Sequence, residues 1–244
     1  MNYLFEKYVE KIKKLPNGEI DKEDILNFNF LLSEEKKMKV YYAPHNEYTN
    51  RKAKIIIVGI CPGWTQTEIA YKTAKQDLEN KVTIEEILKH CKKEARFAGS
   101  MRKNLIDMLD ELNLPKKLNV SSFKELFEKD GLLHTTSLIP YPVFVEGKNY
   151  TGHTPTIIQS QLLMEYVKNH FYKEIKSFEQ PPMIIPLGKA VEDVLKLMIQ
   201  ENIITDKQCL FGFPHPSGAN GHRKEEFLKN KNLLIDKINL YFSE

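Results

Sequence analysis

The chain has 244 residues, of which 41% are hydrophobic and 28% are charged. This length and composition suit one α/β domain with a modest extension. A net charge of +3 is too small to indicate nucleic-acid binding by itself. The three cysteines are odd in number and far apart, which argues against a disulfide framework. No apolar run reaches the roughly 20 residues that span a bilayer, and the first residues lack a signal-peptide core. We therefore expect a cytoplasmic protein.

Strands and helices are predicted to alternate along most of the chain. Apolar spacing and caps predict helices at 2–15, 22–32, 65–78, 84–94, 101–112, 154–171, 190–199 and 225–241. Apolar runs predict strands at 38–42, 55–58, 132–138, 183–187 and 208–213. This alternation is typical of α/β proteins with helices on both faces of the sheet. The fold class predicted is a three-layer α/β/α architecture around a central, mostly parallel four-stranded sheet, formed by all these strands except 38–42. Residues 1–50 are expected to form a helical extension packed on a core domain of residues 51–244.

Two predicted strands each end in a loop rich in glycine and proline. Gly59-Ile60-Cys61-Pro62-Gly63 follows the strand at 55–58, and His215-Pro216-Ser217-Gly218 follows the strand at 208–213. Such loops meet above the carboxyl ends of parallel strands, where ligands bind in open α/β sheets. The two loops are therefore the first candidates for a functional site.

These loops and three further segments resemble, in the same order, motifs of the uracil-DNA glycosylase superfamily. The five segments are Gly59–Gly63, Arg96–Leu105, Thr135-Thr136-Ser137, Ile184–Ala190 and His215-Pro216-Ser217. The resemblance covers roughly residues 54–240. It implies a protein that binds a base flipped out of DNA.

The resemblance also implies roles for particular residues. His215 is the expected catalytic residue, because a histidine against the base carbonyl stabilises the anion that leaves when an N-glycosidic bond breaks. Phe97 and Trp64 are expected to stack on the flipped base, although core packing accounts equally well for Phe97 and a helix-start position for Trp64. Ser217 resembles a serine that contacts a DNA phosphate, with a turn-forming role as the alternative.

Other positions depart from the superfamily. Cys61 stands where most members have the Asp or Asn that orients the attacking water, and a neutral thiol does this poorly. Cys61 is thus either a thiolate catalyst or a small buried filler. Thr136 stands where several branches read the pyrimidine with an Asn. The remaining expected base-binding residues are Gly59, Ile60, Pro62 and Gly63, and the remaining expected DNA-binding residues are His222 and Arg223.

Three functions remain open on the sequence alone. The first is a DNA N-glycosylase that hydrolyses the bond to a damaged or modified base, and the second is a catalytically silent nucleic-acid-binding member of the same fold. The third is a hydrolase of free nucleosides. We expect DNA or a nucleotide as the partner, no membrane, and neither a metal nor another cofactor, since the three cysteines lack iron–sulfur or zinc spacing. The sequence leaves protein partners unknown.

Overall fold

The computed structural model describes residues 3–97, 99–129, 131–218 and 220–243, which divide into two compact units. Unit 1 consists of Met1–Thr49, Cys61–Arg96 and Ser137–Phe171, and unit 2 consists of Asn50–Ile60, Phe97–Thr136 and Tyr172–Glu244. The five-residue loop Gly59–Gly63 thus begins in unit 2 and ends in unit 1. The predicted division into residues 1–50 and 51–244 stays a prediction.

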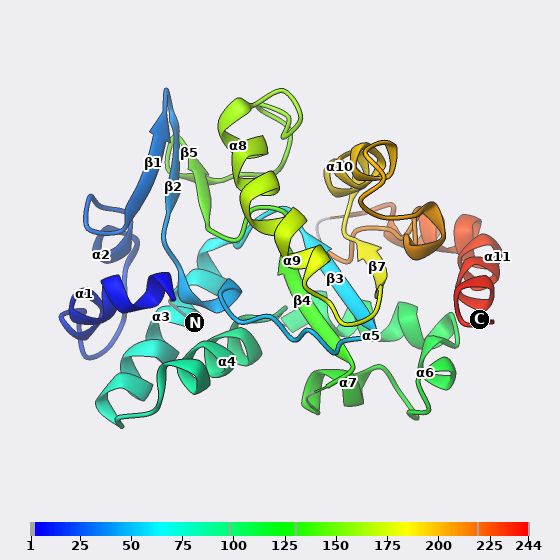
Figure 1. Cartoon of the computed structure of the whole chain (residues 1–244), viewed down its shortest axis with the longest axis horizontal. Coiled ribbons are helices and arrows are strands. Elements are labelled where there is room, and N and C mark those ends of the chain that lie inside the picture. The colour runs from blue at the N-terminus through cyan, green and yellow to red at the C-terminus, as the bar shows by residue number, and fades with distance from the viewer. Residues whose placement is uncertain (1–2, 98, 130, 219, 244) are drawn as a thin grey trace. The chain divides into compact units, whose positions relative to one another are not determined.

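Unit 2 contains a three-stranded parallel sheet in the order β4-β3-β7 (Figure 1). The strands are β3 (Ile55–Gly59), β4 (Leu133–Ser137) and β7 (Met183–Pro186). β3 and β7 pair from Ile55↔Met183 to Val58↔Pro186, and the Leu187 amide continues the ladder by donating to Val58 O. All four apolar residues of β3 before Gly59 are fully buried, as expected for a strand covered on both faces.

Helices of unit 2 bury one face of this sheet. Ile55, Ile57 and Ile185 share an apolar cluster with residues of α5 (Gly99–Glu111) and α11 (Arg223–Tyr241). Successive strand residues face opposite sides, so these three lie on one side of the sheet. The remaining elements of unit 2 are α6 (Leu114–Lys117), α7 (Lys124–Glu128), α9 (Tyr172–Lys176), α10 (Lys189–Gln200) and η4 (Asp206–Gln208).

The predicted α/β class is confirmed, but the predicted central sheet of four strands is wrong. Residues 208–213 form a single parallel bridge, Ile184↔Cys209, in place of a fourth strand. Gly212 turns the chain away with a φ of 86°. Side chains, in place of a neighbouring strand, then pair with the backbone of Gly212. Its amide donates to Glu192 Oε1, and its carbonyl oxygen accepts from Asn230 Nδ2.

Unit 1 contains a second, antiparallel sheet in the order β1-β2-β5-β6, which the sequence did not predict. Its strands are β1 (Leu31–Glu35), β2 (Met38–Tyr41), β5 (Val143–Val145) and β6 (Lys148–Asn149). Only β2 matches a predicted strand. Glu146 and Gly147 join β5 to β6 with φ values of 50° and 76°, the signature of a type I′ turn.

The helices of unit 1 correct two predicted ranges. α2 spans only Lys22–Ile25, because β1 begins at Leu31, and the helix predicted from Thr154 begins at Gln161. Ser160 is the N-cap there: its Oγ accepts a hydrogen bond from the Leu163 amide. The other elements are η1 (Leu4–Tyr8), α1 (Val9–Lys13), η2 (Pro44–Asn46), α3 (Trp64–Glu79), α4 (Ile84–Ala95), α8 (Gln161–Tyr166) and η3 (Val167–Phe171). No helix within the described residues is long and apolar enough to cross a membrane.

Unit 1 also buries a histidine, His45, in η2. Its side chain is 3% exposed, and neither ring nitrogen has a hydrogen-bond partner within the described part of the chain. Burial, and secondarily the nearby charge of Lys92, lower the pKa of His45 to about 3. His45 is therefore neutral at physiological pH.

Candidate functional site

The carboxyl ends of the unit 2 strands bring together several residues predicted from the sequence. Gly59 ends β3, with Ile60 directly after it, and Thr136 is the penultimate residue of β4. Gly188 follows the carboxyl end of β7 and contacts His215. His215 and Gly59 thus lie at the same edge of the sheet, where the strand alternation predicts a ligand site.

His215 packs against Gly188, which has no side chain to obstruct it. Gly188 adopts a φ of 94°, and a Cβ built on it would lie 3.3 Å from Cδ2 of the imidazole. Glycine is therefore required here for two reasons, the left-handed backbone and the close approach of the ring.

Replacing Gly188 by alanine is expected to destabilise the protein by about 1–3 kcal/mol, because the new methyl group strains the backbone and pushes the imidazole aside. Chemical denaturation measures this loss. Gly221→Ala is the matched control, since nothing lies within 4 Å of a Cβ at Gly221. Equal stability of the two variants would show that the His215–Gly188 contact is not tight.

The hydrogen bonds of His215 define its tautomer. The Ser217 amide donates to Nδ1 at 3.2 Å, and a backbone N–H can only donate, so Nδ1 is an acceptor. Burial lowers the pKa of His215, which favours the neutral ring. A neutral imidazole with an unprotonated Nδ1 carries its proton on Nε2. His215 therefore presents a single N–H donor and no positive charge.

Three contacts hold the loop that carries His215. Asn104 of α5 donates to Pro216 O at 2.8 Å, and Asn220 donates to His215 O at 3.3 Å. Arg223, predicted to bind DNA, uses Nη1 to donate to Ser217 O at 2.7 Å. His222 is also predicted to bind DNA. Its side chain is exposed and lies 4.0 Å from Glu225. The loop is thus held by one side chain of α5 and by two side chains that follow it in the sequence.

Two of the predicted base-binding residues, Phe97 and Thr136, are buried. Phe97 is 8% exposed and belongs to the apolar cluster of unit 2, as the core-packing alternative requires. Thr136 is 5% exposed, and its Oγ1 donates to Glu174 Oε2 at 2.8 Å. The other oxygen of Glu174 lies 2.9 Å from Nε2 of His134. Since the hydroxyl proton of Thr136 is engaged by Glu174, Thr136 can only accept a hydrogen bond from a ligand.

The segment Cys61–Trp64 belongs to unit 1. Two residues hold it, Asn149 at the end of β6 and Tyr150 directly after β6. The Cys61 thiol lies 3.9 Å from Tyr150 O, and burial raises the pKa of this thiol to about 12. A raised pKa favours the protonated thiol of Cys61 over the thiolate. The Trp64 amide donates to Asn149 Oδ1 at 3.1 Å. Pro62 is buried, and Gly63 and Trp64 are half-buried.

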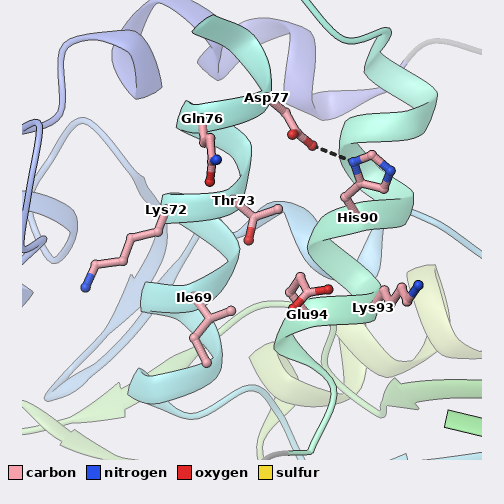
Figure 2. Close-up of a pocket in the computed structure, with 8 residues that line it drawn as sticks. All are labelled: Ile69, Lys72, Thr73, Gln76, Asp77, His90, Lys93 and Glu94. Carbon is pink, nitrogen blue, oxygen red and sulfur yellow. Dashed lines mark hydrogen bonds and ion pairs between the residues drawn. The ribbon is translucent and has the colours of Figure 1, made fainter. Parts of the chain in front are cut away.

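A groove of about 520 Å³ lies between α3 and α4 in unit 1, and none of its lining residues is a predicted site residue (Figure 2). Asp77 points toward His90 across the groove, with Oδ2 2.8 Å from Nδ1. The groove is open and lined by residues of both charges: Ile69, Lys72, Thr73, Gln76, Asp77, His90, Lys93 and Glu94. It has no counterpart among the motifs of the sequence.

Comparisons with known proteins give two similar chains. No family model matches this sequence. Among solved structures, the crystal structure of wild-type Pedobacter heparinus SMUG2, a uracil-DNA glycosylase family member, matches with a TM-score of 0.44 and 12% identity, covering 95% of this chain and 93% of that chain.

The second similar chain is the uncharacterized protein YoxB of Bacillus subtilis (strain 168). It is 45% identical over 232 residues, which cover 95% of this chain and 90% of YoxB. Identity at this level over nearly the whole of both chains shows common descent and a common fold. This chain therefore belongs to the YoxB family.

Proposed function

We propose that this protein binds a base flipped out of DNA and hydrolyses its N-glycosidic bond. The observation that carries this proposal is His215, a neutral imidazole whose Nε2–H is its only ring donor, held at the carboxyl ends of parallel strands. A donor fixed in this way stabilises the negative charge that develops on a departing base. The five superfamily-like segments supply the reason for choosing a base in DNA as the ligand.

In this proposal, the residues of unit 2 have separate roles. His215 donates to an oxygen of the base, and Gly188 gives the imidazole room. Ser217, His222 and Arg223 contact the phosphate backbone, where a positive side chain positions DNA without reading its sequence. Gly59 and Ile60 form the floor on which the base rests.

The catalytically silent binder remains the second candidate, because Cys61 provides no group that orients water. Its thiol has a raised pKa and is a weak hydrogen-bonding group. The sequence neighbour Ile60 is apolar, and Glu68, the first carboxylate after the loop, is bound to Lys72 at 2.6 Å. Because Cys61, Ile60 and Thr136 replace the groups that orient water and read a pyrimidine, we propose that the substrate is a modified base other than uracil.

A base-release assay tests the proposal. Single- and double-stranded oligonucleotides carry uracil or one of a panel of deaminated and alkylated bases, and alkali cleaves the strand wherever a base has been lost. We expect release of one modified base and little release of uracil. Cys61→Asn and Cys61→Asp are expected to make uracil release detectable, because each restores a side chain that binds water.

Replacing Cys61 by alanine tests whether its thiol takes part in catalysis. Activity on the preferred base is expected to survive Cys61→Ala, since a protonated thiol is not the nucleophile. Tight, base-specific binding without release by the parent protein would identify the silent binder. If the protein neither binds nor releases a base from any oligonucleotide, the proposed function is refuted.

A further inference from the structure

A largely buried chain of hydrogen bonds in unit 2 ends at Thr136, the penultimate residue of β4. It begins at the Asn50 amide, which donates to Nδ1 of His134 at 3.4 Å. Nε2 of His134 lies 2.9 Å from Oε1 of Glu174, and the Thr136 hydroxyl donates to the other oxygen of Glu174 at 2.8 Å. Glu174 lies on α9, beside β4 (Figure 1). All four residues belong to unit 2, as does His215.

The Asn50 amide determines the direction of the bonds in this chain. Since a backbone N–H can only donate, Nδ1 of His134 is an acceptor and the ring carries its proton on Nε2. The imidazole therefore donates to Glu174. Both oxygens of Glu174 are then acceptors, which is the pattern of an ionised carboxylate. The hydroxyl proton of Thr136 is thus held toward Glu174 before any ligand arrives.

Stability alone does not explain why a carboxylate is placed here. The side chains of Glu174 and His134 are 11% and 1% exposed. A buried polar pair of this kind often gives no more stability than apolar residues of the same shape, because both groups lose their water. The pair has one local effect that apolar residues would lack, since it orients the hydroxyl of Thr136. That effect has a use where Thr136 meets a ligand.

The oxygen of Thr136 keeps an unused capacity to accept. A hydroxyl oxygen has two lone pairs, and within the residues that the structure describes no donor bonds to Oγ1 of Thr136. Thr136 lies near the carboxyl end of β4, and His215 packs against Gly188 after the carboxyl end of β7, with β3 between the two strands. A fixed acceptor and a fixed donor thus lie at the same edge of one sheet.

We infer that Glu174 is a positioning residue that sets base specificity, because it holds Thr136 as a pure acceptor for an N–H group of the bound base. This inference rests on the proposed function and names its substrate class, a base that offers a carbonyl oxygen to His215 and an N–H donor to Thr136. Hypoxanthine is such a base. Adenine is not, because it has no carbonyl and its ring nitrogen at that edge is an acceptor. A member of this class that pairs weakly in duplex DNA also costs least to flip out.

Glu174→Gln tests the inference by reversing the polarity of Thr136. The N–H of His134 still requires an acceptor, so the new amide is expected to turn its oxygen to His134 and its NH2 group to Thr136. The hydroxyl then accepts from the amide and donates to the ligand. Affinity is measured on oligonucleotides that carry hypoxanthine or unsubstituted purine, whose ring nitrogen is an acceptor where hypoxanthine has N–H.

The parent protein is expected to prefer hypoxanthine. Glu174→Gln is expected to reduce the ratio of the two affinities by about three- to tenfold, the range for one lost hydrogen bond. A merely structural role of Glu174 would weaken both affinities equally and leave the ratio unchanged. Glu179→Gln makes the same substitution at an exposed position of unit 2. This control is expected to change neither the ratio nor the thermal unfolding midpoint.

Thr136→Val removes the hydroxyl at nearly constant volume and takes over the test if Glu174→Gln does not fold. It is expected to lower the affinity for hypoxanthine and to leave the affinity for purine the same or higher. An unchanged ratio in the variant that decides the test, in a protein that binds hypoxanthine specifically, overturns the role of Glu174 alone. Absence of base-specific binding by the parent protein overturns the proposed function and this inference with it.

Discussion

Replacing His215 by alanine is expected to reduce base release by a factor of about one hundred or more, while DNA affinity changes little. The imidazole meets its full charge only when the base departs as an anion, so its hydrogen bond is strongest in the transition state. Removal of one such donor typically lowers the rate by about 100- to 1,000-fold. Single-turnover release from the preferred oligonucleotide measures the rate, and a titration of labelled DNA measures the affinity.

His222→Ala is the control for this experiment, because His222 is exposed and lies in the same segment. It is expected to weaken DNA binding slightly and to leave the rate of base release unchanged at saturating protein. Parent-like release by His215→Ala would remove His215 from the mechanism. A large loss of affinity without a change in rate would assign it to ground-state binding instead.

Acid is expected to destabilise the protein through His45, by at most about 1.4 kcal/mol for each pH unit below 6.5. The folded-state pKa of His45 is about 3, whereas an unfolded histidine titrates near its ordinary value of 6.5. Between these two values the unfolded chain binds a proton that the folded chain excludes. The stability is therefore fully present above pH 6.5 and is lost progressively as the pH falls toward 3.

Denaturant unfolding at a series of pH values between 4.5 and 7.5 checks this expectation with His45→Gln and the parent protein. The variant cannot titrate, so its stability is expected to depend less steeply on pH, whatever its stability at pH 7.5. His222→Gln makes the same substitution at an exposed histidine and should leave the slope unchanged. The same slope in all three proteins would show that the pKa of His45 is not lowered.

Local sequence patterns predicted the parts of the fold that depend on apolar runs and helical spacing. The run Ile55–Val58 and the apolar face of α10 are such cases, and both elements lie close to where they were expected. The fourth strand failed because side chains from Glu192 and Asn230 satisfy the backbone of Gly212, which no local pattern reveals. The antiparallel sheet of unit 1 was missed because β5 and β6 are three and two residues long. Its one local signal was the Glu146-Gly147 turn.

The candidate site likewise contains some residues that local sequence patterns predict and others that depend on contacts distant in the sequence. Gly59 and Thr136 could be predicted because each lies at or beside the end of an apolar strand, and His215 because it follows the apolar run at 208–213. Asn149 and Glu174 could not, since their roles arise from contacts with Trp64 and Thr136 that are distant in sequence. The raised pKa of Cys61 likewise depends on burial in unit 1 and not on its neighbours in the chain.

The Ser217–His215 hydrogen bond limits which ligand atoms the imidazole can meet. A ring that donates through Nε2 and is blocked at Nδ1 attracts a keto oxygen and repels an amino group placed at the same point. Loss of an amino group by deamination turns a donor into an acceptor on the edge of adenine or guanine. A backbone amide two residues along the chain would thus let this site accept a deaminated base and reject its parent at that edge, without any charged group taking part.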